Sequence, residues 1–296
     1  MRTLRAATRG SPLAIWQTEH IAALLQAIDA DVAVELVVVD TQGDRRLEVP
    51  IWELGGKGVF AKEVQAAVLD GRADLAVHSA KDLPSVPVPG LVLAAVPERG
   101  DPRDALVGST LAGLGSGAVV ATGSLRRQVE LRRHRPDLGF ASLRGNMQTR
   151  LAKAANHDAI VVAATALDRL GLADHIAERL DIETMLPQVG QAALAVECRD
   201  DDVELRSLLA RIEHDPTRRC VDAERAFLAE LGGDCSLPAG AHARLDGSGG
   251  LILRAFLASA DGDRMLRSEA DGRDATVGSL VARELLDRGG ADLLGR

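Results

Sequence analysis

Residues 4–17 read LRAATRGSPLAIWQ, and this stretch indicates how the rest of the chain is built. The run Leu4–Thr8 predicts a strand. Ser11 then predicts a helix N-cap, with Pro12 at the first helical position. Apolar residues follow at helical spacing, at Leu13, Ile15, Ile21, Leu24 and Leu25. A strand, a short polar turn and a helix are typical of an α/β unit.

The same order returns in the middle of the chain. Ala118–Thr122 predicts a strand and Ser124–His134 a helix, and the turn ATGSLR at 121–126 is similar to ATRGSP at 7–12. Further strands are expected at 32–39, 75–77, 91–96, 160–164 and 192–197. Helices are expected at 60–69, after Arg150, from Leu167, and in a stretch that ends at Leu209. Residues 41–58 read as a polar, glycine-rich loop. The first two thirds therefore predict two α/β units, with a linker at 98–102.

The last third follows a different pattern. A helix is expected at 216–231, then three strands at 239–245, 251–257 and 265–270, and a final helix at 274–288. Strands followed by one covering helix predict a small α+β domain.

Composition excludes several classes of protein. The 296 residues carry a net charge of -8 and include two Trp, four Phe and no Tyr, which argues against a nucleic-acid binder with stacking aromatics. The apolar runs are far shorter than a membrane span, and we expect a cytoplasmic protein without a membrane partner. Cys198, Cys220 and Cys235 show no CxxC spacing, so neither disulfides nor a metal site is expected.

Basic residues cluster within residues 126–150. This segment holds seven arginines, opposed by only Glu130 and Asp137: Arg126, Arg127, Arg132, Arg133, Arg135, Arg144 and Arg150. Arginine grips carboxylate or phosphate through two parallel hydrogen bonds. The cluster therefore predicts a ligand with several negative charges, although Arg132, Arg133 and Arg135 are better explained as a solvated helix end.

Other segments leave two interpretations open. The turns at 7–12 and 121–126 are either ordinary N-caps or anion sites at helix N-termini. In the segment HSAKD at 78–82, Lys81 and Asp82 form either a surface ion pair or a site that holds an acid and moves a proton. GGKG at 55–58 lacks the phosphate-loop spacing and suits a cationic lid. Cys235, in the turn-rich GGDCSLP at 232–238, is either structural or an attachment point.

Eight segments in order resemble the porphobilinogen deaminase family, whose members are also called hydroxymethylbilane synthases. They are ATRGSPLAIWQ at 7–17, GGKGVF at 55–60, AVHSAKDLP at 76–84, DPRDA at 101–105, TGSLRR at 122–127, LRGN at 143–146, VGQ at 189–191 and the Cys235 loop. The resemblance is collinear and spans nearly the whole chain.

The resemblance implies an α/β fold with two domains like those of periplasmic binding proteins, joined by a double crossover, and a small C-terminal α+β domain. The expected bounds are 1–98 with 190–212, then 101–187, and 215–296 for the domain with the cysteine loop. Hinges are expected near 97–101 and 186–191.

The implied activity is that of a transferase of tetrapyrrole and haem biosynthesis. A dipyrromethane cofactor is joined to Cys235 through a thioether, four porphobilinogen units are added head to tail with loss of ammonia, and hydrolysis releases hydroxymethylbilane. Porphobilinogen is the one partner implied, with no nucleic acid, and family analogy implies a monomer.

Site residues follow from the motif matches. Asp82 is expected beside the pyrrole N–H, where it stabilises the azafulvene cation left by ammonia and assists proton transfer. Binding residues are expected to be Arg9, Ser11, Lys57, Ser79, Lys81, Thr122, Ser124, Arg126, Arg127, Arg144, Asn146, Arg150, Arg169 and Gln191.

Three positions depart from the family pattern. Ala192 and Ala195 stand where glycine is usual, which is expected to stiffen the second crossover. Asp234 precedes the cysteine where glycine is usual, and its charge is expected to slow cofactor attachment by disfavouring the thiolate.

Two rival classes of protein remain as alternatives to this family. One is a solute-binding protein of the periplasmic type, and the other is a nucleic-acid binder that uses residues 126–150.

Overall fold

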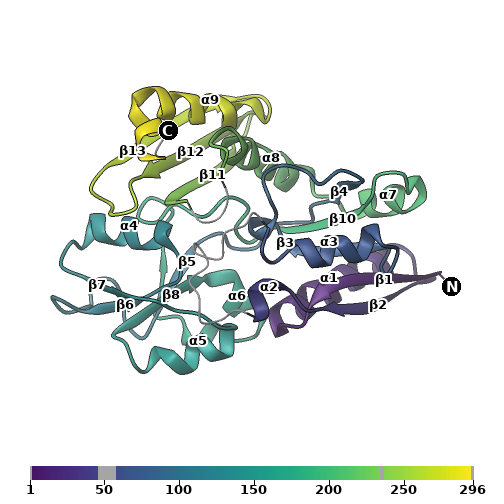
Figure 1. The fold of residues 1–296 in the computed structure, drawn as a ribbon, viewed down its shortest axis with the longest axis horizontal. Coiled ribbons are helices and arrows are strands. Elements are labelled where there is room, and N and C mark those ends of the chain that lie inside the picture. Colours follow the sequence, from purple (N-terminus) through teal and green to yellow (C-terminus); the bar gives the residue numbers. More distant parts are fainter. Residues whose placement is uncertain (1, 46–57, 234–236, 295–296) are drawn as a thin grey trace.

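The computed structural model of the chain describes residues 2–45, 58–233 and 237–294. The strands form two mixed five-stranded sheets and one antiparallel three-stranded sheet, here called the N-terminal, central and C-terminal sheets (Figure 1). Within the described ranges, no helix is both long enough and apolar enough to cross a membrane.

The N-terminal sheet is assembled from two distant parts of the chain. Its order is β2-β1-β3-β10-β4, with β1 parallel to β2 and β3, and β10 antiparallel to β3 and β4. The strands are β1 (Arg2–Arg9), β2 (Val32–Val39), β3 (Leu75–Ser79), β4 (Leu91–Ala95) and β10 (Leu194–Arg199).

Alternating side chains on these strands bury both faces of the N-terminal sheet. Ala6 faces a core shared with Ile21 of α1, whereas Ala7 faces a core shared with Val64 of α3. The covering elements are α1 (Pro12–Ile28), α3 (Lys62–Leu69), α7 (Val203–Leu209) and the 3₁₀ turn η4 (Ala210–Ile212); α2 (Gln42–Arg45) and η2 (Ala80–Asp82) follow β2 and β3.

The central sheet repeats this topology with the order β7-β6-β8-β5-β9. Here β6 is parallel to β7 and β8, and β5 is antiparallel to β8 and β9. The elements are β5 (Asp104–Val107), β6 (Val119–Ala121), α4 (Leu125–His134), β7 (Gly139–Ala141), α5 (Met147–Ala154), β8 (Ala159–Ala163), α6 (Ala164–Arg169), η3 (Ala173–His175) and β9 (Glu178–Leu180). The chain enters this unit through β5 and returns through β10, so each crossover supplies an antiparallel strand to the next sheet.

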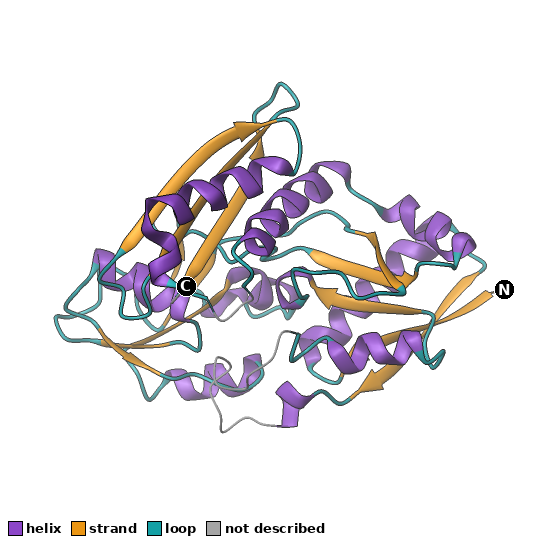
Figure 2. Cartoon of the chain, turned by 45° about the horizontal axis from the view of Figure 1, so that its top comes forward, coloured by secondary structure: helices purple, strands orange, loops and turns teal. Residues whose placement is uncertain are grey.

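The C-terminal sheet has the order β11-β12-β13 and is covered on one face by α8 and α9 (Figure 2). The elements are α8 (Asp215–Glu230), β11 (Ala239–Leu245), β12 (Leu251–Ala258), β13 (Met265–Gly272), α9 (Thr276–Leu285), the π-turn η5 (Leu286–Gly290) and α10 (Ala291–Leu293). On the other face, Phe256 packs with Val129 of α4 and with Leu186. This apolar contact docks the C-terminal unit onto the central one.

The predicted fold class, two α/β units with a double crossover and a small α+β unit, is confirmed. Sequence patterns missed β5, β7 and β9, and they missed α2 within the expected loop at 41–58. The missed strands are only three or four residues long, which is too short for periodicity to show. The helix expected to begin after Arg150 begins at Met147, and the strand expected from Ala192 begins at Leu194.

Candidate functional site

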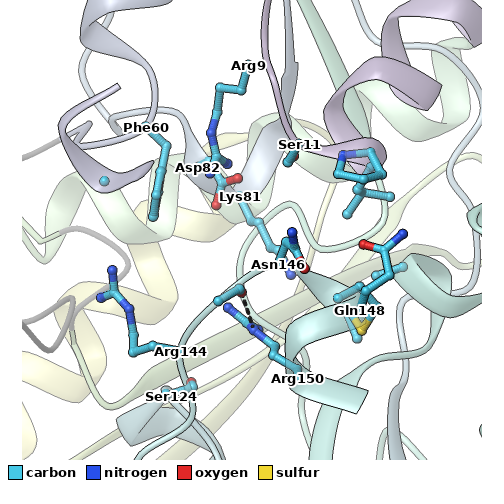
Figure 3. Close-up of a pocket in the computed structure, with 18 of the residues that line it drawn as sticks. Arg9, Ser11, Phe60, Lys81, Asp82, Ser124, Arg144, Asn146, Gln148 and Arg150 are labelled. Carbon is cyan, nitrogen blue, oxygen red and sulfur yellow. Dashed lines mark hydrogen bonds between the residues drawn. The ribbon is translucent and has the colours of Figure 1, made fainter. Parts of the chain in front are cut away.

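A cavity lies between the N-terminal and central units, at the carboxyl ends of their parallel strands. Arg9 ends β1 and Ser11 follows it, Lys81 and Asp82 follow β3, and Ser124 follows β6. In Figure 3, Arg9, Ser11, Lys81 and Asp82 enter from one side, and Ser124, Arg144, Asn146 and Arg150 from the other. Open α/β sheets bind their ligands in this position.

Three helices begin at the wall of this cavity. Ser11 is the N-cap of α1, Ser124 of α4 and Asn146 of α5, and each of these residues lines the cavity. Ser11 Oγ accepts the N–H of Ala14 at 3.3 Å, and Asn146 Oδ1 accepts that of Thr149 at 2.9 Å. The first turn of a helix carries unpaired N–H groups and the positive end of its dipole. Both turns that the sequence left open therefore form part of one electropositive wall.

Charged side chains reinforce that polarity. Asp82 is the only acidic residue among the described residues that line the cavity, and it faces five cations: Arg9, Lys81, Arg127, Arg144 and Arg150. Burial, and next the charge of Arg127, lowers the pKa of Lys81 to about 8. Burial together with Arg127 and Arg144 lowers the pKa of Arg150 to about 10. Such an excess of buried positive charge suits a ligand with several carboxylates.

Asp82 ends the 3₁₀ turn η2, which follows β3 directly. The turn is fixed from both sides, because Ala80 N–H donates to Ala193 O of the second crossover at 2.9 Å and Leu83 N–H donates to Ala80 O. The negative charge of Asp82 raises the pKa of both Lys81 and Arg150. A carboxylate among cations is suited to stabilise a cation that forms during a reaction.

Phe60 supplies an aromatic wall. The guanidinium carbon of Arg9 lies 4.2 Å from the centre of its ring. A Cβ at Gly43 would lie 2.1 Å from a ring carbon of Phe60, so the phenyl group and the glycine backbone are in close contact. Sequence analysis did not single out Phe60, although it ends the motif GGKGVF.

The floor of the cavity is a buried polar cluster. Arg126 and Arg127, in the first turn of α4, both donate to the carboxylate of Asp104 on β5, at 2.6 and 2.7 Å. Gln191 Nε2 donates to the same carboxylate at 3.0 Å, and its Oε1 accepts from Lys81 Nζ at 3.3 Å. Arg127 and Lys81 reach the cavity from this cluster, whereas Arg126 and Gln191 lie beneath it.

The remaining expected residues have mixed positions. Ser79 and Thr122 lie outside the cavity lining, and buried Thr122 accepts the N–H of Ser124 through Oγ1. Arg169 also lies outside it, donating to Ala192 O at 2.7 Å with its guanidinium over the ring of Trp16. Lys57 and Cys235 fall outside the described residues. Cys198 and Cys220 are both buried, and burial raises the pKa of each thiol to about 11.

Residues that sequence reasoning missed also line the cavity: Phe60, Gln148 and Gln188. Gln148 lies two residues from the expected Asn146, and positions two apart in a helix do not share a face, so helical spacing gave no signal for it. Gln188 lies within the expected second hinge, and nothing in its type marked it as a lining residue.

Hydrogen bonds also fix the segment beyond Asp82 to the C-terminal unit. Ser85 Oγ donates to Gly233 O at 3.1 Å, and Arg225 of α8 donates to Pro84 O at 2.9 Å. The described chain at Gly233, which leads into the Cys235 loop, is therefore held close to the segment that carries Asp82. Within the described residues, no cluster of His, Cys, Asp or Glu has the arrangement of a metal site.

Comparison with known proteins gives two family matches. Residues 4–207 match the model of the porphobilinogen deaminase dipyromethane cofactor binding domain, and residues 218–287 match that of the porphobilinogen deaminase C-terminal domain. The chain is 51% identical over 254 residues to porphobilinogen deaminase of Xanthomonas euvesicatoria pv. vesicatoria, covering 84% of each chain. It is 49% identical over 254 residues to that of Nitratidesulfovibrio vulgaris, covering 84% of this chain and 80% of the relative.

Among solved structures, the chain is similar to a periplasmic substrate-binding protein of an ABC transporter from Coxiella burnetii. The identity is 13%, the match covers 72% of this chain and 93% of the other, and the TM-score is 0.44.

Proposed function

The chain belongs to the porphobilinogen deaminase family, and on that basis we propose that Asp82 is its catalytic carboxylate, set in a cavity that binds the carboxylates of cofactor and substrate. The observation that carries this proposal is the position of one carboxylate among five cations. The activity itself is that of a hydroxymethylbilane synthase: it joins four porphobilinogen molecules head to tail with loss of ammonia and releases hydroxymethylbilane.

The cavity fits the dipyrromethane cofactor of the family. Each pyrrole ring of cofactor and substrate carries an acetate and a propionate, so the growing chain accumulates negative charge. Burial is the main cause of the lowered pKa values of Lys81 and Arg150, and the charges of neighbouring arginines add to it. Bound carboxylates would offset both effects. When bound, the cofactor supplies the pyrrole carbon to which the first substrate is joined. Arg9, Arg127, Arg144 and Arg150 would bind its side-chain carboxylates together with those of the substrate.

Asp82 acts on the substrate. Its carboxylate would accept a hydrogen bond from the pyrrole N–H and stabilise the positive charge that develops as ammonia leaves porphobilinogen. We also propose that this carboxylate accepts the proton that the ring loses after the new bond forms.

Expected binding residues that lie beneath the cavity act through those that line it. Arg126 and Gln191 contact Asp104 rather than the open space, so we propose that they support Arg127 and Lys81. Ser79, Thr122, Arg169 and Lys57 remain proposed binding residues. Thr122 and Arg169 have protein partners already described, and Lys57 lies outside the described residues.

We propose Cys235 as the attachment point of the cofactor. The contacts Ser85–Gly233 and Arg225–Pro84 support this, because they hold the described chain next to this loop close to the Asp82 segment. We also propose domains at 1–98 with 190–212, at 101–187 and at 215–296, with hinges near 97–101 and 186–191. The three sheets fall within these bounds. We further propose a cytoplasmic monomer with no nucleic-acid or membrane partner, which the acidic net charge of -8 supports.

Intact mass tests the attachment site. The purified enzyme is expected to exceed its sequence mass by two porphobilinogen units less two ammonia, and Cys235→Ser is expected to lack this surplus. If the variant kept the surplus, another residue would carry the cofactor.

Asp82→Asn tests the catalytic role. We expect kcat to fall by about 100-fold or more, since one preorganised electrostatic group contributes roughly that much, while cofactor content stays unchanged. Asp287→Asn, at an exposed position, is the matched control. Wild-type kcat in a fully loaded Asp82→Asn enzyme would contradict the proposal.

A further inference from the structure

Asp104 is a buried carboxylate that lies outside the lining of the cavity. It is the first residue of β5, it has no exposed surface, and it belongs to the motif DPRDA, to which no role has so far been assigned. It does not line the cavity, so it is not a group that touches substrate.

Three side chains converge on Asp104. Arg126 Nη2 donates to Oδ2 at 2.6 Å; Arg127 donates to Oδ1 from Nε at 3.0 Å and from Nη2 at 2.7 Å; and Gln191 Nε2 donates to Oδ1 at 3.0 Å. These contacts come from α4 and from the second crossover, so one carboxylate joins the central unit to the chain segment that returns from it.

The contacts fix how Arg127 faces the cavity. Asp104 takes up the edge of the guanidinium formed by Nε and Nη2, and Val161 O accepts from Nη1 at 3.2 Å. Asp104 does not occupy the outer edge, between Nη1 and Nη2, and Arg127 is among the residues that line the cavity. That edge has the fork geometry that binds a carboxylate through two hydrogen bonds.

Gln191 extends the arrangement to Lys81. Its Nε2 donates both to Asp104 and to Pro102 O, at 3.0 and 2.7 Å, so its Oε1 is turned toward Lys81 Nζ at 3.3 Å. Lys81 is also near Asp82 on its own turn and near Arg126 and Arg127 of α4. Asp82 and Asp104 favour its charged form, whereas the two arginines disfavour it.

We propose that Asp104 is a positioning residue of the polymerisation reaction, which holds Arg127 and, through Gln191, Lys81 in the geometry that binds substrate carboxylates. It does so as the buried counter-charge of the cavity floor. This inference rests on the proposed binding roles of Arg127 and Lys81.

Asp104→Asn, assayed as the loaded holoenzyme, tests this role. We expect KM for porphobilinogen to rise by about 10- to 100-fold, the loss expected for misplaced charge-assisted hydrogen bonds, with a smaller change in kcat. The alkaline limb of kcat/KM is expected to move to lower pH, because one of the two charges that hold the proton on Lys81 is removed. Asp104→Glu is expected to recover part of the KM.

Asp137→Asn is the matched control. Asp137 also pairs with an arginine, Arg135, at 2.8 Å, but lies outside the cavity lining, and the variant is expected to keep wild-type KM and pH profile. If Asp104→Asn lowered only the unfolding temperature and left both KM and the alkaline limb unchanged, the inference would be wrong.

Two further variants keep the test decisive. If Asp104→Asn yields no folded holoenzyme, Gln191→Met removes the link to Lys81 while Asp104 keeps its arginines, and an unmoved alkaline limb in that variant overturns the inference. Arg127→Met tests the premise separately. Unchanged KM in Arg127→Met would refute the binding role of Arg127, whereas raised KM there with unchanged KM in Asp104→Asn would refute only the positioning role.

Discussion

Arg99 forms a two-pronged ion pair with Glu224, with Nη1–Oε1 and Nη2–Oε2 distances of 2.6 and 3.1 Å. Glu224 is fully buried and also accepts the backbone N–H groups of Gly190 and Ala243, at 2.7 and 3.0 Å. Arg99 Nε donates to Gln191 O at 2.7 Å. One buried pair therefore ties the first crossover, the second crossover and the C-terminal unit together.

Removal of Arg99 is expected to destabilise the whole enzyme. Arg99→Met leaves the Glu224 charge buried without its partner, and such breaks cost about 3–5 kcal/mol. Thermal or denaturant unfolding of the purified variant measures this cost. Arg283→Met removes the arginine of an exposed pair with Glu230, and the variant is expected to unfold almost as the wild type does, because solvent screens such a pair. Equal losses in the two variants would mean that the buried pair does not bind the units together.

Deprotonation of Lys81 is expected to cause the alkaline limb of the pH profile of kcat/KM. With a pKa of about 8 in the free enzyme, Lys81 is charged below that pH and becomes neutral above it. Its attraction for a carboxylate then disappears, so kcat/KM for porphobilinogen is expected to fall as pH rises through about 8. Since kcat/KM reports the pKa values of the free enzyme, it is the parameter to follow. Lys81→Arg keeps its charge, and this limb is expected to vanish; a limb that persists there unchanged belongs to another group.

Arg150 is expected to contribute to substrate affinity. Its Nε donates to Gly145 O at 2.8 Å, which orients the guanidinium within the cavity lining. Arg150→Gln is expected to raise KM for porphobilinogen by about 10- to 100-fold, since hydrogen bonds to charged groups contribute that much. The control is Arg133, an exposed member of the same arginine cluster at 126–150, and Arg133→Gln is expected to keep the wild-type KM. Similar KM changes in both would point to a general charge effect.

Substitution by glycine is expected to stabilise the protein at Ala192 and to destabilise it at the neighbouring Ala193. Ala192 has a φ of 70°, in the left-handed region, and it is the one non-glycine described residue with positive φ. Ala192→Gly is expected to raise the free energy of unfolding by about 0.5 kcal/mol, because the strain of the Cβ exceeds the entropy cost of glycine. Ala193→Gly, at a fully buried position, is expected to lower it by about 1 kcal/mol. Denaturant titrations compare the two, and a loss in both would show that Ala192 is not strained.

The structure gives a physical account of the departure at Ala192. The carbonyl of this residue accepts from Arg169 Nη2 at 2.7 Å and from Gly100 N–H at 3.3 Å. Both contacts hold the second crossover in a turn that glycine would adopt freely. The expectation that alanine stiffens the second crossover stays a prediction. A comparison of hinge motion in Ala192→Gly and in the wild-type enzyme would test it.

Local sequence determined much of this protein. The polar turns before α1 and α4 predicted their N-caps, because capping and the first helical turn depend on adjacent residues. Apolar runs predicted the long strands β1, β2 and β12, and the ordered motifs indicated the family. Asp82, Lys81 and the arginines at 126–150 were found as chemistry-bearing residues for the same reason.

Only the tertiary structure decided which of those arginines face a ligand. Arg126 and Arg127 are adjacent in sequence and identical in type, yet Arg127 lines the cavity and Arg126 is turned to Asp104 and Leu186. The short strand β5 that carries Asp104 escaped detection, because its pairing with β8 and β9 comes from distant segments. Burial and ion pairing depend on which segments of the chain are in contact in the folded protein, and local sequence patterns do not specify these contacts.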